Sequence, residues 1–216
     1  MASEIKEGTL DLINHLPILQ VITPMLIAPI LVVLNNKTLS WLLSFLGALA
    51  CLFISVLLIQ TVSDGSTLTY FLGGWAPPIG IEYRIDAANS ILLFLISIIS
   101  VIVLIFSYSS LHSEIPEEKH TLFYACFLLC LTGLLGVVAT ADIFNVFVFL
   151  EISSLSTYVL VAQGSYLDRR ALSASFNYLI MGTIGATFFV IGIGYIYMAT
   201  GSLNMMDIAE RVSELG

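Results

Sequence analysis

Charged side chains are scarce in this sequence of 216 residues: they make up 10% of the chain, and only 7 are lysine or arginine. Because these few cations are scattered, the chain has no basic patch, which argues against nucleic-acid binding. The formal net charge of −8 is carried by the segments between apolar runs and by the termini, so it says little about the charge of a substrate.

Cysteine and histidine are also few, with 3 of each, and their placement predicts no metal centre. The cysteines lie inside apolar runs without a Cys-x-x-Cys pair, so we interpret them as packing residues. The histidines lie at the ends of apolar runs or between them, where interfacial positions are expected. These residues are Cys51, Cys126, Cys130, His15, His112 and His120. The sequence has no nucleophile elbow, phosphate-binding loop or haem ligand pair, so no cofactor and no enzymatic covalent catalysis are expected.

Long apolar runs dominate the sequence, and hydrophobic residues make up 58% of it. Continuous runs of about 20 apolar residues are typical of membrane-spanning helices, which satisfy their own backbone hydrogen bonds in lipid. Six such runs cover residues 16–34, 39–62, 88–111, 122–139, 143–162 and 171–199. The predicted fold is therefore an all-α membrane protein with about six transmembrane helices.

The segment between the second and third runs differs in composition. Residues 67–72 and 79–84 have strand composition, and a cluster of glycine and proline lies between them. This pattern predicts a small β-hairpin on the membrane face. After the sixth run, residues 202–212 have the pattern of a capped amphipathic helix that lies along the surface.

The distribution of lysine and arginine predicts the orientation in the membrane. Alternating the runs across the bilayer gives one side Lys37, Lys119, Arg169 and Arg170, and the other side Lys6, Arg84 and Arg211. Because Lys119 and the double arginine lie in short loops, we expect their side to be cytoplasmic. Both termini and the hairpin would then be extracytoplasmic, in a bacterial inner membrane.

Glu151 is the most informative residue, because an ionisable group at bilayer depth is costly and is read by default as part of an ion pathway. It follows Asp142 by nine residues, which places it about 13 Å along the fifth helix. Ser154 and Tyr158 lie three and seven residues further on and share its helix face. We expect Glu151 to carry protons with these hydroxyls as neighbours. The alternative is that Glu151 only bonds a neighbouring helix.

Asp142 and Asn145 lie at the start of the same helix. Asp142 is well placed to cap it, and a role in ion access is the alternative for both residues. Asn177, in the sixth run, is neutral and is expected to hydrogen-bond between helices.

Residues 131–160 contain Ala139-Thr-Ala-Asp-Ile-Phe-Asn-Val-Phe-Val-Phe-Leu-Glu151. This stretch resembles the fourth and fifth helices of the antiporter-like subunits of respiratory complex I, membrane-bound hydrogenases and Mrp-type monovalent cation/proton antiporters. Residues 73–86, 178–187 and 199–205 are most similar to the D-type subunit of the Mrp antiporters. The resemblance covers essentially the whole chain.

This resemblance implies a fold of roughly fourteen helices in which two inverted repeats follow three lead-in helices. Residues 1–111 would be the lead-in region with the hairpin, and residues 112–216 the truncated start of the proton-translocating repeat. Glu151 falls on the glutamate that pairs with a lysine of the seventh helix. The sequence stops after the sixth helix, no lysine lies inside a spanning run, and Asn177 stands where many relatives carry a lysine.

The sequence is therefore interpreted as the N-terminal portion of a transporter subunit that exchanges protons for a monovalent cation, Na⁺ being expected. Its partners would be other subunits and lipid, and the missing lysine would come from another chain or from residues outside this sequence. A proton-pumping subunit of complex I or of a hydrogenase is the near alternative. A structural membrane subunit without a transport role and an independent small carrier are alternatives of other classes.

Overall fold

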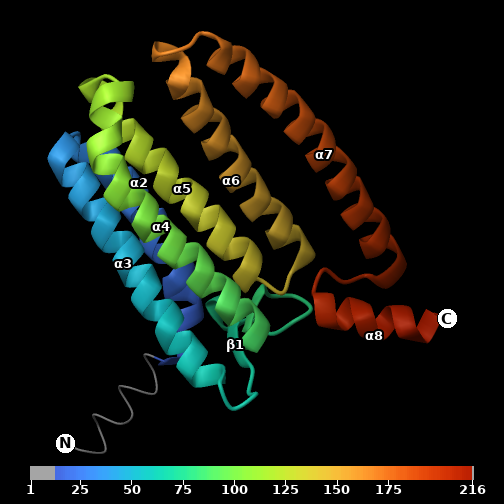
Figure 1. Ribbon diagram of the computed structural model, residues 1–216. Coiled ribbons are helices and arrows are strands. Elements are labelled where there is room, and N and C mark those ends of the chain that lie inside the picture. The colour runs from blue at the N-terminus through green and yellow to red at the C-terminus, as the bar shows by residue number, and fades with distance from the viewer. Residues whose placement is uncertain (1–12, 216) are drawn as a thin grey trace, which may run out of the picture.

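The computed structural model describes residues 13–215, and it confirms six helices that are long and apolar enough to cross a membrane. They are α2 (Leu16–Leu34), α3 (Lys37–Val62), α4 (Ala87–Glu114), α5 (His120–Ala139), α6 (Ile143–Gln163) and α7 (Arg170–Thr200). Successive helices run in alternating directions through one bundle (Figure 1). The chain is a multi-pass membrane protein. Lys6, used above for orientation, and Gly216 lie outside the described residues.

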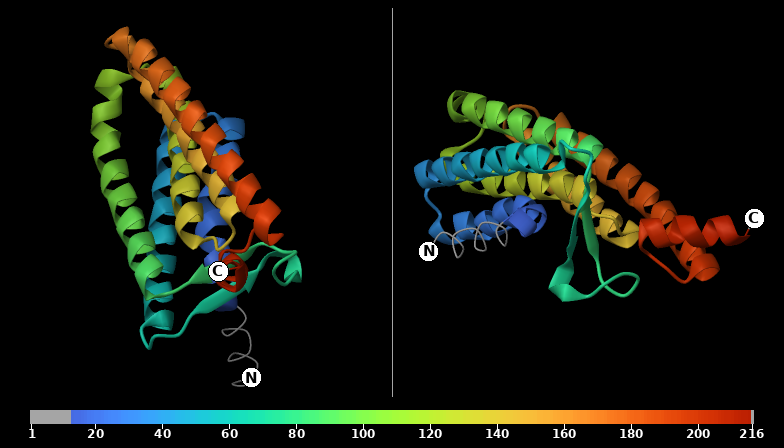
Figure 2. Two further views of the ribbon diagram at one scale, coloured as in Figure 1. Left: turned by 90° about the vertical axis from the view of Figure 1, so that its right-hand side faces the viewer. Right: turned by 90° about the horizontal axis from the view of Figure 1, so that it is seen from below.

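The expected hairpin is present and consists of β1 (Leu68–Phe71) and β2 (Glu82–Ile85). The strands are antiparallel, and Thr69 pairs with Arg84. The hairpin lies across the helix ends where α2, α4 and α6 begin (Figure 2). We call this end of the bundle the hairpin end and the other the opposite end. The amphipathic segment forms α8 (Met205–Leu215), which follows α7 at the hairpin end.

Small, mostly polar residues are buried on both α3 and α4. On α4, Ser90, Ser97, Ser100 and Ser107 are buried at intervals of three or seven residues. The buried residues of α3 include six small ones: Ser40, Ser44, Gly47, Ala48, Cys51 and Ser55. Among them, Gly47 lies against Ile27 of α2 and Ser40 hydrogen-bonds Thr121 of α5. Serine hydroxyls return hydrogen bonds to their own helix, as Ser97 does to the Leu93 carbonyl at 2.8 Å. Small, internally satisfied side chains let two membrane helices approach closely.

The centre of the bundle is α5, which contacts α2, α3, α4 and α6. Two glycines allow α6 to approach it closely. A Cβ atom at Gly133 would lie 2.6 Å from the Phe149 carbonyl oxygen, and one at Gly136 would overlap the Phe149 ring. Only residues 140–142 separate α5 from α6, as the sequence predicts, so the pair forms a tight antiparallel hairpin.

The outermost helix is α7, which packs against α6 along its length and against α8 at its end (Figure 1). Among its residues only Ile193 and Thr200 are buried. Large apolar side chains on its other faces are exposed, including Phe188 and Met198. Such an apolar helix surface is suited to lipid or to other membrane helices.

Candidate functional site

The carboxylate Glu151 is placed by the start of α6. Asp142 caps this helix: its side chain accepts a 2.7 Å hydrogen bond from the Asn145 backbone N–H. A short polar residue at this position satisfies a free N–H and complements the helix dipole. From the cap, nine residues at about 1.5 Å each carry the chain to Glu151. The carboxylate therefore lies within the membrane span, where it is half-buried.

Glu151 lines a cavity of about 260 Å³ between α6 and α7. The walls are Phe147, Leu150, Glu151 and Ser154 from α6, and Gly182, Gly185, Ala186 and Phe189 from α7. The space exists because α7 presents glycine and alanine there. It has room for several water molecules at about 30 Å³ each. A carboxylate and a hydroxyl thus share a small space inside the span that is large enough for water.

Sequence spacing predicts that Glu151, Ser154 and Tyr158 share one helix face, but only two of them line this cavity. Glu151 and Ser154 line it. Tyr158 is buried beside it, and its hydroxyl contacts Gly182, which is a wall residue. Within residues 13–215 no lysine or arginine forms an ion pair with Glu151. The described part of the chain thus supplies the carboxylate and its hydroxyl neighbours but no cationic partner.

A second group of buried polar residues lies at the hairpin end. The Asn204 side-chain amide donates a 2.7 Å hydrogen bond to the Glu82 carboxylate, and both residues are buried. The Ala141 N–H donates to the Glu82 carbonyl at 2.8 Å, and the Met205 N–H donates to the Ala141 carbonyl at 2.9 Å. These bonds join β2, the α5–α6 link and the α7–α8 link, so they fix the start of α6 on which Glu151 is carried.

Burial raises the pKa of two titrating groups at the hairpin end, Asp142 and Tyr83. Desolvation raises the pKa of Asp142, against the opposing effect of hydrogen bonds from the backbone of Asn145 and Phe144. Burial also raises the pKa of Tyr83 to about 12, although a hydrogen bond with the Asn145 side chain lowers it. The Asn145 amide in addition donates to the Thr140 hydroxyl at 3.0 Å. Asn145 therefore holds the α5–α6 link together.

Sequence reasoning missed Glu82 and Asn204. The capped pattern before α8 does mark Asn204, whose side-chain oxygen accepts from the Met206 and Asp207 N–H groups. No local pattern pairs it with a strand residue 122 positions away. His120 also differs from expectation: it is buried, and its ring is 5.1 Å from that of His112. The short turn before α5 folds it inward, where Nε2 bonds the Ile115 carbonyl at 3.0 Å.

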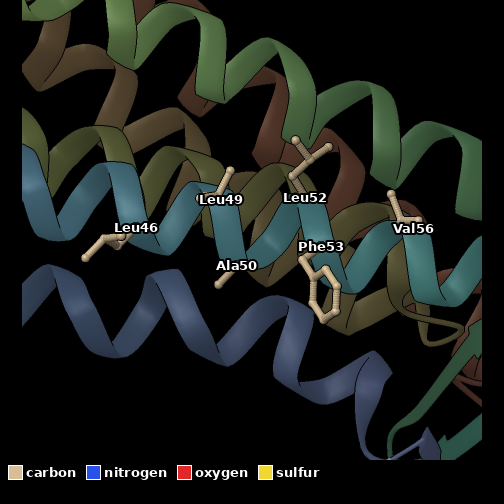
Figure 3. A pocket seen from close by; sticks show the side chains of 6 residues that line it. All are labelled: Leu46, Leu49, Ala50, Leu52, Phe53 and Val56. Carbon is tan, nitrogen blue, oxygen red and sulfur yellow. The ribbon is translucent and has the colours of Figure 1, made fainter.

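A larger groove on the outside of the bundle has no chemistry of this kind. It measures about 560 Å³ on the outer surface of α3 (Figure 3). Its lining is entirely apolar: Leu46, Leu49, Ala50, Leu52, Phe53 and Val56. In the part of the chain from residue 13 to residue 215, no three His, Cys, Asp or Glu side chains are grouped to hold a metal ion. The Glu151 cavity is thus the better candidate for ion chemistry.

A family model and the relatives of this chain agree on one family of membrane subunits. The family described as NADH:quinone oxidoreductase/Mrp antiporter, TM, matches residues 140–215. The N-type subunit of the NADH-quinone oxidoreductase of Desulforudis audaxviator is 41% identical over 204 residues, covering 93% of this chain and 40% of the relative. The D-type subunit of the Na⁺/H⁺ antiporter of Alkalihalophilus pseudofirmus is 31% identical over 203 residues, covering 94% of this chain and 40% of that protein.

A solved structure extends the likeness to three dimensions. A chain of the membrane-bound sulfane sulfur reductase, an archaeal respiratory membrane complex, superposes with a TM-score of 0.83 and 33% identity. The match covers 91% of this chain and 40% of the other. The present chain spans about two fifths of the length of these relatives. It belongs to the antiporter-like family of membrane subunits that includes NADH:quinone oxidoreductase and Mrp antiporter subunits.

Proposed function

We propose that this chain is part of a membrane subunit that couples proton movement to a second process, and that Glu151 carries the proton. The observation that carries the proposal is the half-buried Glu151 carboxylate in a cavity shared with Ser154, inside a membrane span. A carboxylate there must be protonated, paired or wetted. Small changes in its surroundings then change its proton affinity, which is what a carrier needs.

The coupled process in the first candidate is exchange of protons for a monovalent cation. The likeness to the D-type subunit of a Na⁺/H⁺ antiporter across 94% of this chain supports it, and Na⁺ is the cation proposed. Because the chain spans about 40% of that relative, we propose that the positively charged side chain that pairs with Glu151, a lysine, comes from outside these residues. The complete assembly would place this chain among other membrane subunits in a bacterial inner membrane, with the hairpin end extracytoplasmic.

The test is Glu151→Gln in the complete assembly, reconstituted into proteoliposomes with a pH-sensitive dye inside. We expect cation-driven proton movement to fall about a hundredfold or more, the scale of a lost proton-transfer group. Glu210→Gln makes the same chemical change on the exposed side of α8 and should leave the rate unchanged. If Glu151→Gln retains full proton movement, Glu151 is a packing residue, and the structural-subunit alternative replaces this proposal.

A second candidate is a proton-pumping subunit of a respiratory complex. The 41% identity to the N-type subunit of an NADH-quinone oxidoreductase and the 33% identity to the sulfane sulfur reductase chain favour it. The two candidates differ in what drives the protons. In membranes that hold the native assembly, proton movement started by adding Na⁺ supports the antiporter, and proton movement started only by electron transfer supports the respiratory subunit.

A further inference from the structure

We propose that the Tyr158 hydroxyl relays protons between the Glu151 cavity and the opposite end of the α6–α7 seam, and that Gly182 is the positioning residue that makes room for it. This inference rests on the proton-carrying role proposed for Glu151. It adds a direction to that role, because Tyr158 lies two helical turns from Glu151 toward the opposite end.

The Tyr158 side chain lies along the seam between α6 and α7. Its backbone carbonyl accepts a 2.7 Å hydrogen bond from the Ser175 hydroxyl of α7. Its own hydroxyl reaches Gly182, seven residues later on α7 and about 10 Å further toward the hairpin end. Long side chains in helices lean toward the helix N-terminus, which for α6 is the hairpin end. The hydroxyl therefore points from the opposite end toward Glu151.

Gly182 joins this hydroxyl to the cavity. It is one of the wall residues of the space that Glu151 and Ser154 line. A Cβ atom at Gly182 would overlap the Tyr158 hydroxyl oxygen. Only glycine therefore lets the hydroxyl lie at the cavity wall. Gly194, further along α7, differs, since a Cβ atom there meets nothing within 4 Å.

The ring of Tyr158 is held in place while its hydroxyl is left available. Tyr178 packs edge-on against it with ring centroids 4.9 Å apart. Within residues 13–215, no protein group hydrogen-bonds to the Tyr158 hydroxyl, so it can bond to water. A phenol both donates and accepts. It can release its proton on one side and take one up on the other, with no net change in charge or oxidation state.

The alternative interpretation is that Tyr158 only packs against its neighbours. A phenylalanine at this position would then support the same rate of proton movement. Tyr158→Phe separates the two because it removes one oxygen atom and keeps the ring. In the complete assembly we expect Tyr158→Phe to slow proton movement about a hundredfold, the lower end of the range for a lost proton-transfer group. The solvent deuterium isotope effect on the remaining rate should rise, which a packing defect would not cause.

Gly182→Ala should slow proton movement to a similar degree, because the added methyl group displaces the hydroxyl. Gly194→Ala is the matched control and should leave the rate unchanged. The double variant Gly182→Ala with Tyr158→Phe removes the hydroxyl oxygen, which the added Cβ atom would overlap, and leaves only the ring Cζ atom at 2.9 Å for a small shift to relieve. We expect it to assemble normally and to remain slow. Recovery of the wild-type rate in the double variant would overturn the relay and leave only packing.

The two proposals fail in different ways. If Glu151→Gln stops proton movement while Tyr158→Phe keeps the wild-type rate and isotope effect, the relay is wrong and the Glu151 proposal stands. If Glu151→Gln keeps the wild-type rate, the Glu151 proposal fails and the relay with it. Subunit content on native gels shows whether each variant assembles, and Tyr158→Phe keeps the test decisive if Gly182→Ala does not.

Discussion

The Asn204 amide donates a hydrogen bond to the buried Glu82 carboxylate across 122 residues of sequence. This bond ties the hairpin to the segment that follows α7. Backbone bonds through Ala141 bring the start of α6 into the same structure. The helix that carries Glu151 and the helix that forms the other wall of its cavity are therefore held together at the hairpin end.

This contact predicts a pH-dependent defect in Asn204→Asp. The new carboxylate keeps the oxygen that caps α8 but replaces the donated N–H with a second negative charge opposite Glu82. Two like charges in contact destabilise the folded protein, so stability is retained at low pH and lost at higher pH, where both carboxylates are ionised. At pH 8 we expect a loss of about 1–3 kcal/mol, the cost of an unpaired buried polar group.

Thermal unfolding in detergent from pH 5 to pH 8, a range that lies above the ordinary carboxyl pKa values of about 4, measures this effect. The control is Asn36→Asp, the same change at the exposed cap of α3, where the side chain accepts from the Leu39 N–H at 3.2 Å. That variant should unfold like the wild type. Equal unfolding of Asn204→Asp and wild type at pH 8 would show that the contact to Glu82 is not maintained.

Asp142 gives a prediction of its own. Its folded-state pKa is raised above the ordinary value of 3.8, mainly by desolvation. The stabilising effect of its bound proton is therefore full below that value and disappears as pH rises through the raised pKa. Asparagine caps a helix as well as aspartate and does not titrate. We expect Asp142→Asn to become progressively more stable than the wild type as pH rises above about 4.

Unfolding midpoints across pH check this prediction. Asp64→Asn is the comparison, because Asp64 is exposed and hydrogen bonds from Ser66 lower its pKa. It should show no such gain with rising pH. Parallel midpoints for Asp142→Asn and wild type at every pH would mean that the carboxylate is not desolvated in the folded protein.

The close approach of α5 and α6 predicts that Gly133→Ala is destabilising. The added Cβ atom would lie 2.6 Å from the Phe149 carbonyl oxygen and from Ser153. Overpacking of this kind costs about 1–3 kcal/mol. Gly194→Ala, where a Cβ atom meets nothing within 4 Å, should be close to neutral. A thermal unfolding comparison in detergent decides it, and identical midpoints for the two variants would contradict the packing of this helix pair.

Local sequence patterns predict the elements of this fold well. The first apolar run coincides with α2 at both ends, and the others differ from their helices by at most three residues at an end. This accuracy has a physical reason, because lipid leaves the backbone of such a run no alternative to a helix. The hairpin was equally predictable, because strand composition flanks a turn cluster. Whether residues 1–111 and 112–216 act as separate regions stays a prediction.

Contacts between elements were not predictable in the same way. The spacing of Glu151, Ser154 and Tyr158 fixes their common face but not which helix covers it. Gly182 of α7 lies opposite the Tyr158 hydroxyl because of the tilt and register of α6 and α7. Sequence periodicity does not predict either quantity. Glu82 looks like an ordinary polar strand residue until the chain brings Asn204 to it.

Infrared difference spectroscopy on the complete assembly tests the central claim most directly, because it detects protonation of a carboxyl group during turnover. The account predicts that a protonated-carboxyl band changes when the driving gradient is applied, that this change is absent in Glu151→Gln, and that Glu210→Gln retains it. A carboxyl band change of full size in an assembled Glu151→Gln variant would contradict the claim that Glu151 carries the proton.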